Sequence, residues 1–140
     1  MALLTQKAIL MTFEEMLEEM PFDKITVSAL VRRCGVSSNT FYYHNQDIYD
    51  FLDVWMSTRL GMLKKNVRES LGWKEEMRIF LKYCQSHPKL TTNILSSGAR
   101  CYLEHYIFTE TDDFFVEYVR DRTEARALSE ESIRYIAQFC

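Results

Sequence analysis

Residues 26–44 read TVSALVRRCGVSSNTFYYH, and this stretch decides how we interpret the rest of the chain. Thr26 can cap a short helix over residues 27–34, because a threonine hydroxyl accepts a hydrogen bond from the first turn. Gly35 can end that helix, since glycine readily adopts the left-handed conformation found at helix ends. A second short helix over residues 38–44 follows. Two short helices joined by a tight turn with glycine form a helix-turn-helix.

The second of these helices, which Ser37 can cap, carries more hydrogen-bonding groups than a buried helix needs. Phe41 is its expected apolar anchor. The remaining side chains are polar, or aromatic with a polar tip: Ser38, Asn39, Thr40, Tyr42, Tyr43 and His44. The major groove of DNA admits such a helix and offers it donors, acceptors and thymine methyl groups. A plain helical hairpin within a bundle is the competing interpretation, although it does not explain the polar face.

The rest of the chain repeats its apolar residues at helical spacing, so we expect an all-α fold. Only 4 Gly and 2 Pro interrupt the 140 residues. We expect a helix from Thr5, as cap, to about Met20, a long one from Asp47, one ending near His87, two shorter ones split at Gly98, one opened by Thr111 and a last one capped by Ser129.

The composition is that of a folded protein, with 47% hydrophobic and 14% aromatic residues. The formal net charge is −3, so no overall basic excess indicates a nucleic-acid partner. The N-terminal segment does not resemble a signal peptide, and no apolar run approaches the roughly 20 residues of a membrane span. The four cysteines form no CxxC pair, so we expect reduced, mostly buried thiols in a cytoplasmic protein.

The sequence from about Thr5 to Trp55 resembles the TetR family of transcriptional regulators. The resemblance is carried by PFDKITV and TFYYH, with an amphipathic helix before them and an acidic residue that opens a long helix after them. The TFYYH ending is similar to the subgroup typified by regulators of dihydroxyacetone-kinase operons. The resemblance implies a helix-turn-helix DNA-binding domain at residues 1–46. It also implies a helical effector-binding and dimerisation domain at residues 47–140, incomplete relative to the family.

Members of this family are homodimers that bind a pseudo-palindromic operator and respond to a small effector. The resemblance implies backbone-phosphate contacts from Thr26 and Ser28, to which the hydroxyl of Ser37 at the start of its helix can add another. Side chains over base edges would be Ser38, Asn39, Thr40 and Tyr43. Backbone or flanking-base contacts would come from Tyr42 and His44. The family continues for two long helices beyond this chain, and those helices usually form the dimer interface.

Two positions depart from the family, which usually has an aromatic or aliphatic residue after the histidine and a lysine three residues further on. Here these positions are Asn45 and Ile48. The missing lysine removes a phosphate contact and its counterion release. Residues 1–56 also hold four basic against eight acidic residues. We therefore expect weak, steeply salt-dependent DNA binding, and the alternative is a helical sensor or protein-interaction module that keeps the fold without binding DNA.

A second candidate site is an effector pocket in the C-terminal part of the chain. Its expected lining residues are Tyr83, Arg100, Cys101 and His105. The guanidinium of Arg100 could face a carboxylate or phosphate of the effector. The competing interpretation makes His105 a core histidine that packs among aromatic residues.

Metal and catalytic sites find little support in the sequence. Cys84, His87, Cys101 and His105 are suitable zinc ligands, but their spacing matches no standard arrangement, and we expect no metal. The chain contains no nucleophile elbow, phosphate-binding loop or HExxH motif. We therefore expect a protein that is not an enzyme and has no cofactor beyond an unknown small effector.

Overall fold

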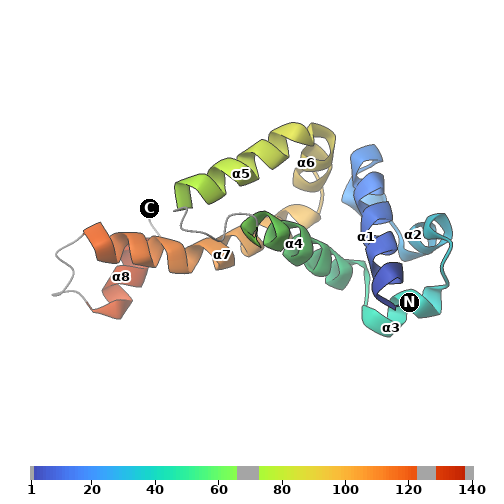
Figure 1. Cartoon of the computed structure of the whole chain (residues 1–140), viewed down its shortest axis with the longest axis horizontal. Coiled ribbons are helices and arrows are strands. Elements are labelled where there is room, and N and C mark those ends of the chain that lie inside the picture. Colours follow the sequence, from blue (N-terminus) through green and yellow to red (C-terminus); the bar gives the residue numbers. More distant parts are fainter. Residues whose placement is uncertain (1, 66–72, 123–128, 138–140) are drawn as a thin grey trace. The chain divides into compact units, whose positions relative to one another are not determined.

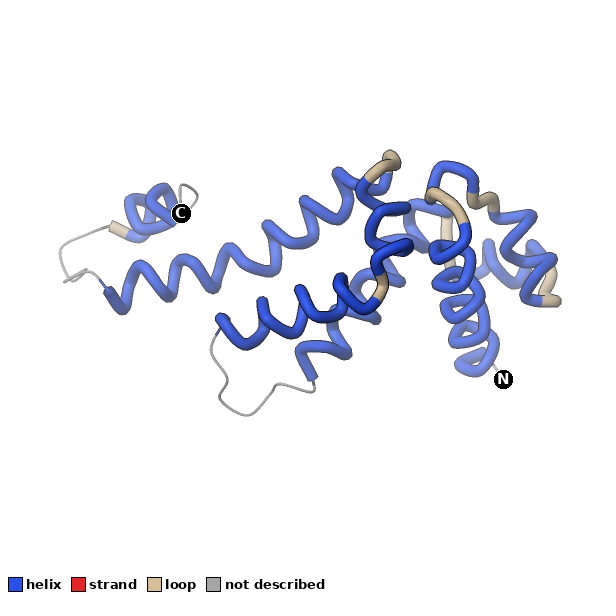
Figure 2. The backbone as a smooth tube through the Cα atoms, turned by 90° about the horizontal axis from the view of Figure 1, so that it is seen from above, coloured by secondary structure: helices blue, strands red, loops and turns tan. Residues whose placement is uncertain are grey.

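The computed structural model describes residues 2–65, 73–122 and 129–137. Nearly all of these residues are helical, short loops connect the helices, and no strand occurs in the three ranges (Figure 2). The all-α prediction is therefore confirmed. The elements are α1 (Ala2–Glu19), the 3-10 helix η1 (Phe22–Lys24), α2 (Val27–Cys34), α3 (Ser38–His44), α4 (Ile48–Lys65), α5 (Trp73–Ser86), α6 (Pro88–Leu95), α7 (Ala99–Arg122) and α8 (Glu130–Ala137).

The chain divides into two compact units, residues 1–102 and 103–140, so the boundary falls within α7. In the first unit, α1 packs against α2 and α6, and α2 packs against α3 (Figure 1). In the same unit, α5 packs against α4 and α6. Residues 1–46, the expected first domain, thus share one compact unit with α4, α5 and α6.

The core of the first unit is built around the ring of Phe13 in α1. This ring makes edge contacts with Phe51 of α4 at 5.2 Å, with Trp55 one turn later at 6.0 Å, and with Phe22 of η1 at 6.2 Å. Edge-to-face pairs at these centroid distances add to the stabilisation from burial alone. The cluster therefore ties α1, η1 and α4 together beneath α2 and α3.

Several predicted helix ends are confirmed by the backbone and its caps. The hydroxyl of Thr26 accepts a hydrogen bond from Ala29 N at 3.1 Å, and Gly35 ends α2 with a φ of 74°. Asp47 caps α4, since its carboxylate accepts from the backbone N–H groups two and three residues later, at 2.8 and 2.9 Å. Ser129 caps α8 by accepting from the N–H three residues later at 3.2 Å. Local chemistry thus sets each of these ends.

Two predicted helix starts are wrong. Helix α1 already begins at Ala2, so Thr5 lies inside it and does not cap it. Helix α7 runs without interruption from Ala99 to Arg122, so Thr111 opens no new helix. The physical reason is that no glycine or proline follows Gly98 within this range, and nothing breaks the backbone hydrogen bonds.

The burial expected of the cysteines is also wrong for those that the structure describes. Cys34 and Cys84 are half-buried, Cys101 is exposed, and all three are free thiols. The exposed thiol lies in the first turn of α7 and donates a hydrogen bond to Gly98 O at 3.1 Å. Cys140 lies outside the described residues.

In the second unit, α7 and α8 each bury an aliphatic side chain, and an ion pair joins the two helices. The side chains of Val116 in α7 and Ile133 in α8 are both buried. Arg120 donates to both carboxylate oxygens of Glu130, at 2.7 and 2.8 Å. Because this ion pair is exposed, the buried aliphatic side chains contribute more to the stability of the pair of helices.

Candidate nucleic-acid interface

Helix α3 is held in place by Phe41, whose side chain has no exposed surface. Its ring packs at 5.3 Å from the ring of Phe51 in α4 and so joins the aromatic core. The ring of Tyr42 meets the Phe41 ring edge-on at 5.4 Å, but the Tyr42 side chain is exposed. Fully burying a phenylalanine stabilises a fold by roughly 1.5–3 kcal/mol, which is enough to fix a helix of this length on the core.

The first turn of α3 is closed by its own hydroxyl groups. Ser37 accepts a hydrogen bond from Thr40 N at 3.2 Å, and the two hydroxyl oxygens lie 2.9 Å apart. The predicted cap is therefore confirmed. Each hydroxyl can make a further hydrogen bond, since it has one donor and two acceptor positions.

The remaining side chains of α3 face solvent. The exposed residues of this helix, which we call the α3 outer face, are Ser38, Asn39, Tyr42, Tyr43 and His44. Tyr43 is the most exposed of the tyrosines among them, at 83%, and its ring meets the ring of His44 edge-on at 4.8 Å. Helix α3 is therefore attached to the core by the buried side chain of Phe41, and its other exposed side chains are polar or aromatic with a polar end.

Helix α2 adds two hydroxyl-bearing residues at its start. Thr26 and Ser28 are both exposed. The Thr26 hydroxyl already caps α2, whereas Ser28 has a side chain at the surface of the first turn. Both are in positions from which they can meet a phosphate group that approaches the start of α2.

The basic residues near α2 are not equally available to a phosphate. Arg33 donates to both carboxylate oxygens of Glu19 at 2.6 Å and lies 3.7 Å from Glu15. These hydrogen bonds hold the pKa of the Glu19 carboxyl below its usual range, so the pair keeps both charges at neutral pH. Arg32 and Lys24 are exposed cations of the same region. The positive charge of Arg33 is therefore largely compensated from within the chain.

Asn45 ends α3, and its polar side chain is buried. It is 5% exposed, and its Nδ2 donates to Phe41 O at 3.2 Å. No hydrogen-bond partner for its Oδ1 occurs among the residues described. In the sequence this position stands out only as a departure from a family pattern, and an amide at a position expected to be apolar was the signal for a buried polar group.

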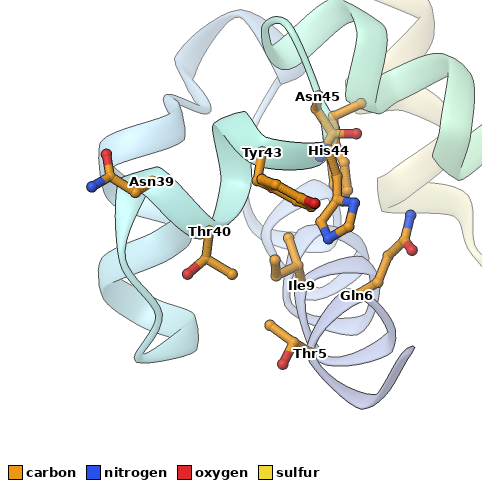
Figure 3. A pocket seen from close by; sticks show the side chains of 9 residues that line it. Thr5, Gln6, Ile9, Asn39, Thr40, Tyr43, His44 and Asn45 are labelled. Carbon is orange, nitrogen blue, oxygen red and sulfur yellow. The ribbon is translucent and has the colours of Figure 1, made fainter. Parts of the chain in front are cut away.

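A cavity of about 410 Å³ lies between α1 and α3, and we call it the α1–α3 cavity. Its lining residues are Thr5, Gln6, Ile9, Asn39, Thr40, Tyr43, His44, Asn45 and Phe51. Figure 3 shows Tyr43 and His44 facing the side chains of α1, whereas Asn39 points away from them. The α3 outer face and the cavity therefore share residues, a relation that spacing along the sequence did not predict.

The residues of the expected effector pocket have different surroundings. Tyr83 in α5 stacks on His87 at 4.4 Å, and its hydroxyl donates to Glu14 of α1 at 3.5 Å. Burial raises the pKa of this phenol, so it stays protonated as a donor. Arg100 and Cys101 are exposed in the first unit, and His105 is exposed in the second unit. The exposure of His105 contradicts the interpretation of it as a core histidine.

In the described part of the chain, no three or more His, Cys, Asp and Glu side chains cluster as metal ligands would. No helix in the same ranges is both long enough and apolar enough to cross a membrane.

No protein-family model matches the chain, and no curated protein sequence matches it.

Proposed function

We propose that the chain is a ligand-responsive, DNA-binding transcriptional regulator of the TetR type, in which α2 and α3 act as a helix-turn-helix. The observation that carries this proposal is the two-sidedness of α3. Phe41 is fully buried, whereas the α3 outer face presents polar tips, with Tyr43 exposed to 83%. A helix with this division has the side chains of a recognition helix, which lies in the major groove with its N-terminal residues against the base edges.

The residue types of α3 suit base edges and phosphates. The amide of Asn39 can pair with the N6 and N7 edge of adenine, and the methyl group of Thr40 can contact thymine. Tyr43 and His44 present ring-borne donors that can reach a base or the adjoining backbone. Thr26 and Ser28, at the start of α2, would fix the register through phosphate contacts.

The local charge predicts weak binding with a marked salt dependence. Arg33 is paired with Glu19, so the cations left for phosphate are exposed residues such as Lys24 and Arg32. Each phosphate neutralised contributes about −0.9 to the slope of log K against log salt concentration. We therefore expect measurable retention of DNA at low salt and its loss as the salt concentration rises.

A pseudo-palindromic operator requires two copies of α3, so we propose that the chain acts as a homodimer. Two-fold symmetry would separate the recognition helices by about one helical turn, roughly 34–36 Å. A small effector that binds a dimer geometry with another spacing would release the operator, because it shifts the population of dimers towards that geometry.

The direct experiment is an unbiased selection of duplex fragments by the purified chain, with the mass of the complex measured at the same time. A recovered two-fold symmetric site and a mass of two chains per duplex are the expected results. Absence of any retained fragment at low salt would overturn the proposal.

Tyr43→Ala tests whether α3 reads bases. We expect it to weaken binding to the selected site by about 1–3 kcal/mol, with a smaller loss on random duplex. Tyr135→Ala is the matched control, because Tyr135 is an exposed tyrosine of α8, outside the α3 outer face. Equal loss on both duplexes would mean that Tyr43 contacts only the backbone.

The second candidate function is a helical sensor or protein-interaction module that does not bind DNA. The ion pair of Arg33 with Glu19 favours it, because this pair removes a cation from the proposed DNA face. The selection experiment separates the two functions. A chain that retains no duplex at any salt concentration, yet is folded, is expected for the module alone.

A further inference from the structure

The α1–α3 cavity is lined by side chains from two helices that can donate hydrogen bonds. Thr5 and Gln6 come from α1, and Tyr43 and His44 come from α3. The hydroxyl groups, the glutamine amide and the histidine ring can each act as a donor. Figure 3 shows the side chain of Gln6 extending from α1 towards the end of α3 that carries His44. Donors from both helices can therefore meet one ligand.

The lining differs in charge from the rest of the N-terminal region. Residues 1–56 hold eight acidic residues against four basic ones, yet no Asp or Glu occurs among the described residues that line the cavity. Lys7, which follows Gln6 in α1, is exposed. A carboxylate in the lining would repel an anion at close range. The α1–α3 cavity is thus a place in this acidic region where an anion can approach hydrogen-bond donors.

The position of the cavity indicates which anion could reach it. The cavity opens beside the α3 outer face, since Tyr43 lines it and is 83% exposed. A helix that lies in the major groove has a sugar-phosphate backbone along each of its sides. Phosphate oxygens accept hydrogen bonds from Gln, Thr and Tyr side chains as well as from Arg and Lys. The backbone beside α3 would therefore bring a phosphate to this cavity.

We propose that the α1–α3 cavity receives a phosphodiester group of the DNA backbone, to which the Gln6 amide donates from α1 and the His44 ring donates from α3. This inference rests on the proposed function and adds α1 to the helices that contact DNA. A backbone contact fixes the protein on the duplex without reading sequence, so Gln6 is a positioning residue. Because the glutamine amide is neutral, its contact releases no counterion and leaves the salt dependence unchanged.

Substitutions of Gln6 that remove its donor or give it a charge test this contact. The affinity of the full chain is measured on the selected duplex and on a random duplex at several salt concentrations. Gln6→Ala should lower the affinity about tenfold on both duplexes, with the same salt slope as wild type. Gln6→Glu should lower it further, because its carboxylate would face the phosphate. Gln6→Lys should raise it and steepen the slope of log K against log salt concentration by about 0.9.

Met11→Glu and Met11→Lys are the matched controls. Met11 is an exposed residue of α1 that does not line the cavity. The two substitutions there introduce the same charges on the same helix, and they should change the affinity by less than about twofold at physiological salt, because solvent screens exposed charges. The urea midpoint of each variant shows that its fold is retained, and each Gln6 variant tests the contact separately.

The outcomes distinguish this inference from the proposed function. If wild type binds both duplexes and the Gln6 variants bind them equally well, the phosphate contact is wrong and the proposed function stands. A loss confined to the selected duplex would mean that Gln6 reads a base, which would also overturn the inference. Saturable binding of inorganic phosphate without DNA, lost in Gln6→Ala, would assign the cavity to the free ion instead. A wild-type chain that binds neither duplex would overturn the proposed function, and this inference with it.

Discussion

The buried amide of Asn45 makes only part of the hydrogen bonding of which it is capable, so we expect Asn45→Leu to stabilise the fold. The substitution removes the acceptor without a partner, and Phe41 O keeps the backbone N–H of residue 45 at 3.1 Å. We expect the free energy of unfolding to rise by about 1 kcal/mol, measured by urea denaturation at pH 7.

The contrasting variant is Asn93→Leu in α6. The Asn93 amide donates to Leu17 O of α1 at 2.7 Å, so its loss removes a hydrogen bond between two helices. We expect this variant to be destabilised by about 1 kcal/mol. A loss of stability in Asn45→Leu as well would mean that solvent satisfies Asn45 Oδ1 in the folded protein.

The exposed pair of Glu19 and Arg33 predicts a pH dependence of stability. Hydrogen bonds from Arg33 lower the pKa of Glu19 from its ordinary value of 4.5. A carboxyl whose pKa is lower in the folded state stabilises the fold above its ordinary pKa, and this stabilisation is lost as the pH falls through the folded pKa. Arg33→Gln should therefore show a smaller loss of stability between pH 7 and pH 3 than wild type.

The measurement is the difference between the urea midpoints at the two pH values. Arg32→Gln is the matched control, since Arg32 is the exposed neighbour of Arg33, and it should retain the pH dependence of wild type. An unchanged difference in Arg33→Gln would show that the exposed pair is screened by solvent.

At the scale of elements, two glycines differ in backbone conformation: Gly35 is left-handed, whereas Gly61 is helical. Gly35 ends α2 with a φ of 74°, although an added Cβ would meet nothing within 4 Å. Gly61 lies inside α4, and a Cβ there would also meet nothing within 4 Å. Gly35→Ala should lower the free energy of unfolding by about 1 kcal/mol through backbone strain. Gly61→Ala should raise it by roughly 0.5–1 kcal/mol, because alanine has the higher helix propensity.

The two glycine variants control for each other, since both add one methyl group in open space. Circular dichroism during urea denaturation measures both midpoints. Shifts of the same sign would contradict a conformational origin.

Helix ends were predictable where a local cap sets them, and unpredictable where nothing local does. Thr26, Gly35 and Asp47 act through hydrogen bonds or dihedral angles within a few residues, and each prediction is confirmed. Thr111 has the residue type of a cap, yet the helix continues through it. A capping side chain competes with the backbone hydrogen bonds of the helix. Where no glycine or proline interrupts those bonds, the helix continues.

The candidate site was predictable only on its outward side. Exposure of Asn39 and Tyr43 followed from helical spacing around the anchor Phe41. The cavity behind them is lined jointly by Ile9 of α1 and Asn45 at the end of α3, residues that are distant in sequence. The spacing of residues within one helix does not show which residues of another helix lie beside it, so this cavity could not be predicted.

At the scale of the whole first unit, Glu14 joins α1 to two other helices. Its carboxylate accepts a hydrogen bond from Trp55 Nε1 at 3.3 Å and pairs with Arg59, both in α4. The Tyr83 hydroxyl of α5 reaches the same carboxylate at 3.5 Å. One side chain of the proposed DNA-binding part thus contacts both α4 and α5.

A double-mutant cycle with Glu14→Gln and Arg59→Met measures this connection. The two side chains are 18% and 33% exposed, so solvent screens the pair only in part. We expect a coupling energy of about 1 kcal/mol, against roughly 0.3 kcal/mol for the Glu75–Arg78 pair one turn apart within α5, whose arginine is 52% exposed. Equal coupling energies would mean that Glu14 is solvated like a surface carboxylate. A larger one for Glu14 would show that this carboxylate contributes to holding α1 against α4, in addition to the aromatic cluster around Phe13.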